Sequence, residues 1–137
     1  MTLDRYDELC AWTLSLGDAD FVHQHVVDAH MLQHADAATK PVGVAFALVG
    51  LHLHLERGFT GREVQRAHMK MGRAGGPWPT FELPDDRGAV THEDVLAAAP
   101  GPERVEAIRA WCASVWAPWS PHRDRVVALL REYEVVP

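Results

Sequence analysis

The sequence predicts an all-α fold, a single-domain bundle of about six helices with a loop that contains Pro and Trp. Three observations favour it: helix-capping signals recur along the chain, apolar residues recur at helical spacing, and hairpin signals such as Asn-Gly are scarce. A chain of 137 residues can bury one hydrophobic core and is too short for two domains of ordinary size. We therefore expect one helical domain over residues 1–137.

Local signals mark the ends of the helices. Thr60 and Glu63 have the Thr-x-x-Glu spacing of a capping box, and Thr91 and Ser120 are residue types favoured as N-caps. Long helices are expected near residues 3–16, 19–35, 42–57, 61–73, 101–117 and 121–134, with a short helical turn over 91–99.

The segment 42–55 is nearly all apolar and is the one ambiguous element. Its His52-Leu53-His54 pattern is also typical of a cupin-type strand, on which residues two apart share a face, whereas a helix separates them by about 200°. Its Ala and Leu content and the capped helices on either side favour a buried central helix. His54 is then the better candidate for an interior site, because it shares a stripe with the small residues Ala47 and Gly50.

Residues 75–86 form the break between the fourth and fifth long helices. Their three prolines exclude a continued helix, while Trp78 and Phe81 argue against disorder. We expect an ordered loop in which Trp78 covers a cofactor or ligand pocket; loop anchoring without a functional role is an equal alternative.

Charge and composition exclude several classes of partner. The chain has 13 Lys and Arg residues against 19 Asp and Glu, and the basic residues are dispersed, so we expect no nucleic-acid partner. No apolar run approaches the roughly 18 residues of a membrane span, and no signal-peptide pattern is present, so we expect a cytoplasmic protein with no membrane partner. Cys10 and Cys112 lack Cys-x-x-Cys spacing and are expected to be buried apolar side chains.

The most informative feature is a group of histidines in the segment 22–34. On a helix, His23, His30 and His34 fall within about 40° of one another, on a stripe shared with Val26 and Met31. A buried imidazole with neither a hydrogen bond nor a metal costs roughly 1–3 kcal/mol. The stripe therefore indicates a bound metal, an internal polar network or another ligand such as haem.

A metal site can be assembled from these residues in more than one way. His30 and His34 have the spacing at which two imidazoles chelate one ion, and His54 or His122 completes the set from another helix. A site around His23 is the alternative, because His23 lies about 10 Å along the helix axis from His30. We expect zinc, iron or nickel, since imidazole suits all three.

Asp28 and Glu56 are the carboxylates nearest to these histidines. Either can act as a catalytic base or orient a ligating imidazole. The alternatives are a surface position or a structural hydrogen bond for Asp28, and a solvated position for Glu56. His25, His68 and His92 are expected to be ordinary exposed histidines.

Three stretches resemble a family of small helical bacterial proteins of unknown function. They are Val27-Asp28-Ala29-His30-Met31-Leu32-Gln33-His34, the segment from Gly50 to Gly58, and the tryptophan-rich segment from Ala110 to His122. The similarity extends over residues 20–133.

The resemblance implies an all-helical fold with interior histidines at His23, His34 and His122. This chain has His30 where the family commonly has Tyr, and Ala47 where it commonly has His. The resemblance implies no reaction, because the family has no assigned activity.

The sequence therefore predicts a metal-dependent enzyme that acts on a small organic molecule in a histidine-lined interior cavity. The alternative is a non-enzymatic module that binds a small molecule or a partner, with the imidazoles in a structural network. A small-molecule substrate or ligand is expected as the partner, and a homodimer is compatible with these features.

Overall fold

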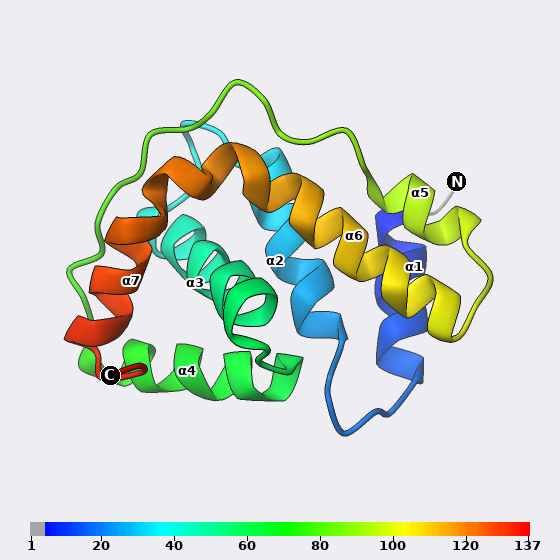
Figure 1. Cartoon of the computed structure of the whole chain (residues 1–137), viewed down its shortest axis with the longest axis horizontal. Coiled ribbons are helices and arrows are strands. Elements are labelled where there is room, and N and C mark those ends of the chain that lie inside the picture. Colours follow the sequence, from blue (N-terminus) through cyan, green and yellow to red (C-terminus); the bar gives the residue numbers. More distant parts are fainter. Residues whose placement is uncertain (1–4) are drawn as a thin grey trace.

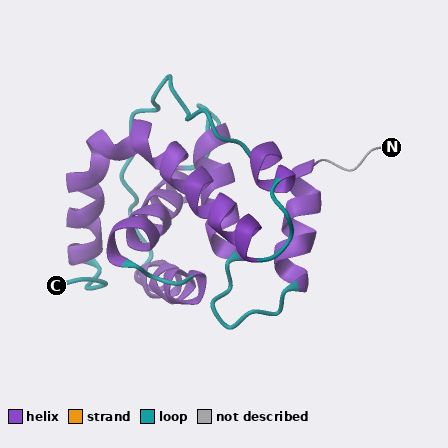
Figure 2. Ribbon diagram, turned by 45° about the vertical axis from the view of Figure 1, so that its right-hand side comes forward, coloured by secondary structure: helices purple, strands orange, loops and turns teal. Residues whose placement is uncertain are grey.

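The computed structural model describes residues 5–137, where all regular secondary structure is helical (Figure 2). The elements are α1 (Arg5–Ser15), α2 (His23–His34), α3 (Pro41–Arg57), α4 (Gly61–Ala74), α5 (His92–Ala97), α6 (Pro102–Trp119), the 3-10 turn η1 (Ser120–His122) and α7 (Arg123–Glu132). The all-α prediction is confirmed, and the ambiguous segment 42–55 lies within α3. The predicted helix start at residue 3 lies outside the described residues. Within 5–137, no helix is long and apolar enough to cross a membrane.

The capping signals are confirmed at two of three positions. Thr60 and Glu63 form the reciprocal hydrogen bonds of a capping box at the start of α4, and Thr91 caps α5. Ser120 was expected to be an N-cap, and that prediction is wrong. Its backbone is helical, with φ −59° and ψ −24°, and its hydroxyl donates to the carbonyl oxygen of Ala117 at 2.7 Å. A capping residue needs an extended backbone, so the helical path continues through Ser120.

Helix α3 lies at the centre of the molecule. Helices α2, α4, α6 and α7 all pack on it, and α6 crosses in front of α2 (Figure 1). Most of α3 is buried, as expected of a helix that is apolar on all sides. Helices α1 and α5 pack against each other at the end of α2 and α6.

Small residues on α3 allow α2 to approach closely. A Cβ atom at Gly50 would overlap the carboxyl group of Asp28, with its Cγ only 2.7 Å away. At Gly43, an added Cβ would already touch the thioether of Met31 at 3.5 Å. Asp28 therefore occupies a notch that exists because residue 50 has no side chain.

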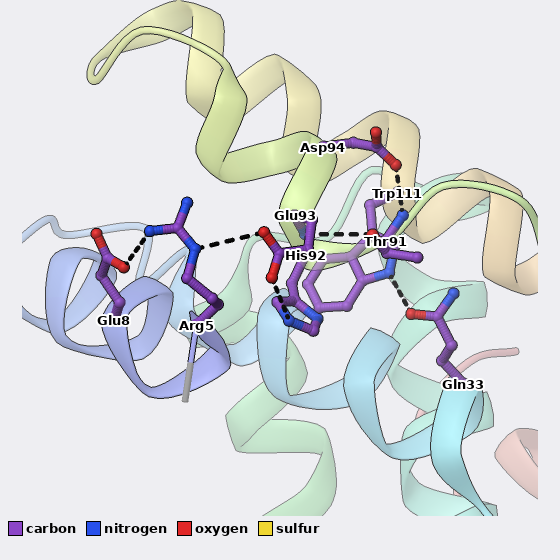
Figure 3. Close-up of polar contacts among 8 residues, drawn as sticks. All are labelled: Arg5, Glu8, Gln33, Thr91, His92, Glu93, Asp94 and Trp111. Carbon is purple, nitrogen blue, oxygen red and sulfur yellow. Dashed lines mark hydrogen bonds and ion pairs between the residues drawn. The ribbon is translucent and has the colours of Figure 1, made fainter. Parts of the chain in front are cut away.

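Residues 75–90, here called the strap, run from α4 across α7 and α6 to α5 (Figure 1). Gln33 holds the strap: its side-chain amide donates to the carbonyl oxygens of Val90 and Arg87 at 2.8 and 3.3 Å. The amide oxygen of Gln33 accepts the indole N–H of Trp111 at 3.0 Å (Figure 3). Ser114 accepts two strap N–H groups at 3.1 and 3.2 Å. The end of the expected ordered loop nearest α5 is thus bound by side chains of α2 and α6.

Candidate functional site

Three of the five histidines predicted as metal ligands are bonded to protein groups in different parts of the fold. Nδ1 of His23 lies 2.8 Å from the hydroxyl oxygen of Thr13. His54 and His122 each donate to a main-chain carbonyl oxygen, at 3.1 and 2.8 Å. These rings therefore face separate partners rather than a common point.

His30 and His34 are close together, with ring centroids 4.3 Å apart, as their helical spacing requires. The ring of His30 stacks on Tyr6 at 3.5 Å, and His34 is exposed. Among residues 5–137, no three His, Cys, Asp or Glu side chains gather in a group that could hold a metal ion. The prediction of a metal-dependent enzyme is therefore wrong, because the other helices bring aromatic and backbone partners to these imidazoles instead of a third ligand.

The two carboxylates predicted to be catalytic lie in different environments. Asp28 is 3% exposed; its Oδ1 accepts from Gln24 at 3.1 Å and its Oδ2 has no partner. Burial raises the pKa of Asp28 well above its usual value, which favours the neutral carboxylic acid over the carboxylate in the core. Glu56 accepts hydrogen bonds from Arg123 at 2.6 Å and from His52 at 3.1 Å, near the surface.

Trp78, predicted to cover a pocket, attaches the strap to the bundle. Its ring stacks on Tyr133 at 5.5 Å and meets Phe46 edge-on at 5.0 Å. It lines a shallow groove of about 360 Å³ on the outer side of α7, which none of the histidines lines.

A larger cavity of about 500 Å³ lies between α2, α3, α6 and two loops. This volume is within the range of small-molecule sites, which is roughly 300–1,000 Å³. The wall is formed by five large apolar residues, four charged residues, two histidines, Gly and Thr: Leu16, Val22, Phe59, Val105, Ile108, Asp18, Asp20, Glu106, Arg109, His25, His54, Gly58 and Thr60.

His25 and His54 stack on each other in this wall, with ring centroids 3.5 Å apart and ring planes 16° apart. His25 is 4% exposed, and its buried Nδ1 has no hydrogen-bond partner. The two residues come from α2 and α3, so the interface that buries Asp28 also forms the histidine pair.

The surroundings keep both imidazoles neutral at physiological pH. Burial, the neighbouring His54 and the guanidinium of Arg109 lower the pKa of His25 to about 3. Burial and Arg109 also lower the pKa of His54, although its hydrogen bond to Phe59 acts in the opposite direction. A carbonyl oxygen only accepts, so Nδ1 of His54 carries the proton and Nε2 carries the lone pair.

His25 was expected to be an exposed histidine, and that prediction is wrong. The buried face of α2 is formed by Asp28, Ala29 and Leu32 together with His25 and Val26, and not by the stripe of His23, His30 and His34. The positions 25, 28, 29 and 32 do have the i, i+3, i+4, i+7 spacing of a buried face. Because His25 and Asp28 on that face are polar, the apolar periodicity of the sequence did not identify it as the buried face. His68 and His92 are also only partly exposed, and His68 is bonded to the Phe46 carbonyl oxygen at 2.7 Å.

The loop at the edge of the cavity has an unusual backbone. Phe21 has a φ of +52°, which a residue with a bulky side chain seldom adopts. Gly61 at the start of α4 packs directly on the Phe21 carbonyl group, where a Cβ would overlap the oxygen. The backbone N–H of Arg62 donates to the carbonyl oxygen of Asp20 at 2.9 Å, and the guanidinium of Arg62 lies 4.8 Å from the Phe21 ring centre. The start of α4 therefore holds this loop in place.

Residues 3–120 match the model of a family of unknown function, DUF5946. The chain belongs to this family. No curated protein and no solved structure matches the DUF5946 chain. The resemblance seen in the sequence is confirmed, but its extent differs: the match begins near the N-terminus and ends at residue 120, so His122 and α7 lie outside it.

The cavity of the DUF5946 protein lies wholly within the matched residues, since its lining runs from Leu16 to Arg109. Gln33, which lies in one of the stretches that carry the resemblance, holds the strap and the indole of Trp111. The clamp and the wall of the cavity both lie within the matched residues.

Proposed function

We propose that this protein is a small-molecule-binding module whose ligand occupies the cavity between α2, α3 and α6. The observation that carries the proposal is the stacked pair of His25 and His54 in the cavity wall. Nδ1 of His25 is buried without a hydrogen-bond partner, which costs free energy of folding. Proteins retain such unfavourable local features chiefly at functional sites.

The rest of the wall supports the same proposal. Val22, Phe59 and Ile108 offer apolar surface, and the two histidines, Arg109 and three acidic residues offer polar groups beside it. Mostly apolar walls with a small number of polar groups are characteristic of ligand sites in proteins. No catalytic step is needed to account for this arrangement.

The test is a screen of small organic compounds by thermal shift, followed by NMR titration of the compounds that raise the Tm. Val105→Trp serves as the blocking variant, because Val105 is 40% exposed and lines the cavity. Leu14→Trp is the matched control, because Leu14 is 56% exposed and does not line the cavity.

We expect compounds that raise the Tm of the wild type and of Leu14→Trp but not of Val105→Trp, since binding stabilises only the state that contains the site. Their titrations should shift the NMR signals of His25 and His54. The proposal fails if no compound stabilises the wild type, or if Val105→Trp responds as the wild type does.

A further inference from the structure

The backbone at the end of α3 determines which nitrogen of His54 carries a proton. Nδ1 of His54 donates to the Phe59 carbonyl oxygen at 3.1 Å. This turn is held in place because the N–H groups of Gly58 and Phe59 both donate to the carbonyl oxygen of Leu53. A neutral imidazole carries one proton, so Nε2 of His54 keeps its lone pair and can accept a hydrogen bond.

The Nε2 atoms of both histidines are free to bind a ligand. Among residues 5–137, neither Nε2 has a hydrogen-bond partner and neither is fully buried, whereas Nδ1 of His25 is buried without a partner. A buried N–H group without an acceptor is rarer than a buried acceptor without a donor, so the proton of His25 belongs on Nε2. The stacked pair in the cavity wall therefore offers one acceptor, on His54, and one donor, on His25.

The charged residues of the wall are either solvated or already bonded. Asp20, Glu106 and Arg109 are exposed, and exposed charges are weakened by water and salt. Asp18 is partly buried and accepts the N–H of Val22 at 2.9 Å.

The histidine pair, by contrast, is the least exposed polar part of the wall. His25 is only 4% exposed, and burial lowers the pKa of both imidazoles, which keeps them neutral. A charged head group placed against these rings would lose its water and meet neutral groups, which is unfavourable. The pair therefore favours an uncharged polar group.

We infer that the ligand is an uncharged organic molecule with a hydroxyl group on an apolar body, and that this hydroxyl donates a hydrogen bond to Nε2 of His54. This inference deepens the proposed function and rests on it. A hydroxyl group both donates and accepts, so it matches the one acceptor and the one donor of the histidine pair. The apolar body packs against Val22, Phe59 and Ile108, which line the same cavity.

The test compares four small probes of similar size: 1-hexanol, its isomer 1-methoxypentane, hexanoate and hexylamine. The ether oxygen of 1-methoxypentane accepts but cannot donate, so its comparison with hexanol isolates the donated hydrogen bond. Dissociation constants are measured by NMR titration at neutral pH and fixed ionic strength. Nitrogen-15 spectra of the histidine rings follow Nε2 of His54 in the same titrations.

The variant His54→Asn removes the Nε2 acceptor, while the amide nitrogen of Asn can still donate to the Phe59 carbonyl oxygen. The matched control is His34→Asn, which replaces an exposed histidine of α2 outside the cavity. Thermal unfolding checks that both variants fold. The nitrogen-15 signal of the wild type tests the same contact without any substitution.

We expect hexanol to bind the wild type about fivefold more tightly than 1-methoxypentane, as one neutral hydrogen bond provides. Hexanol should also shift the Nε2 signal of His54. Hexanoate and hexylamine should bind about tenfold more weakly than hexanol, because their charged head groups lose water. His54→Asn should lose the preference for hexanol over the ether, and His34→Asn should keep it.

Several outcomes would overturn the hydroxyl inference and leave the binding cavity standing. They are equal affinities of the wild type for the two isomers, tighter binding of hexanoate or hexylamine than of hexanol, an unmoved Nε2 signal, and a folded His54→Asn that keeps the preference. If none of the four probes binds, the hydroxyl inference is also wrong. If the compound screen finds no ligand either, the proposed function fails with it.

Discussion

The carboxyl group of Asp28 fills the space that a side chain at position 50 would need, so the close approach of α2 and α3 at this point requires a glycine. The same interface places His25 against His54 one turn further along. Burial of the acid, the stacking of the two imidazoles and the shape of the cavity wall therefore depend on one close approach of two helices.

Replacing Gly50 by Ala should destabilise the protein by about 1–3 kcal/mol, because the added Cβ overlaps Asp28 and forces α2 or the side chain to move. The free energy of unfolding is measured by urea denaturation. In Asp28→Ala the obstructing carboxyl group is gone, so the double variant should be more stable than the sum of the two single effects predicts. Strictly additive effects would show that the two residues do not compete for this space.

Stability should depend on pH in a way that separates His25 from Asp28. The pKa of His25 is lowered to about 3 from an ordinary 6.5, so between these values the unfolded chain binds a proton that the native state excludes. Stability then falls as the pH falls, by about 1.4 kcal/mol per pH unit. Burial also lowers the pKa values of His23, His52, His54 and His68, which act in the same direction.

Asp28 acts in the opposite direction. Its pKa is raised above the ordinary 3.8, so the native state holds a proton that the unfolded chain releases, and stability falls as the pH rises. Urea denaturation at about pH 5, 6.5 and 8 measures both effects. We expect the stability of the wild type relative to Asp28→Asn to fall as the pH rises, because the histidines act alike in both proteins and only the wild type contains the buried acid. A wild type whose stability relative to Asp28→Asn is the same at all three pH values would contradict the raised pKa of Asp28.

The neighbours Gln33 and His34 should respond very differently to substitution. Gln33→Leu leaves the Trp111 indole N–H and the strap carbonyl groups without their partner, and should cost about 1–3 kcal/mol and expose residues 75–90 to proteolysis. His34 is exposed, and His34→Ala should change stability by less than about 0.5 kcal/mol. Thermal unfolding and limited proteolysis provide the measurements. Equal effects of the two substitutions would contradict the role of Gln33 as a clamp.

The helices were predictable because the signals that form them are local. Thr60 and Glu63 are three residues apart, and their side chains satisfy each other's backbone groups regardless of the rest of the fold. The apolar segment 42–55 could be assigned to a buried helix for the same reason, from its composition and from the capped elements around it. The ordered strap was predictable from its prolines and aromatic residues, but not what holds it.

The environment of each histidine was decided only by the tertiary structure. On α2 alone, the stripe of His23, His30 and His34 is as plausible a buried face as the one that contains His25, since both have helical periodicity. Tertiary packing decides between them. The notch at Gly50 accepts Asp28, and His25, on the same face of α2, then lies against His54 of α3. Local sequence therefore determined the elements and their ends, while the partners of polar side chains followed from how closely two helices can pack.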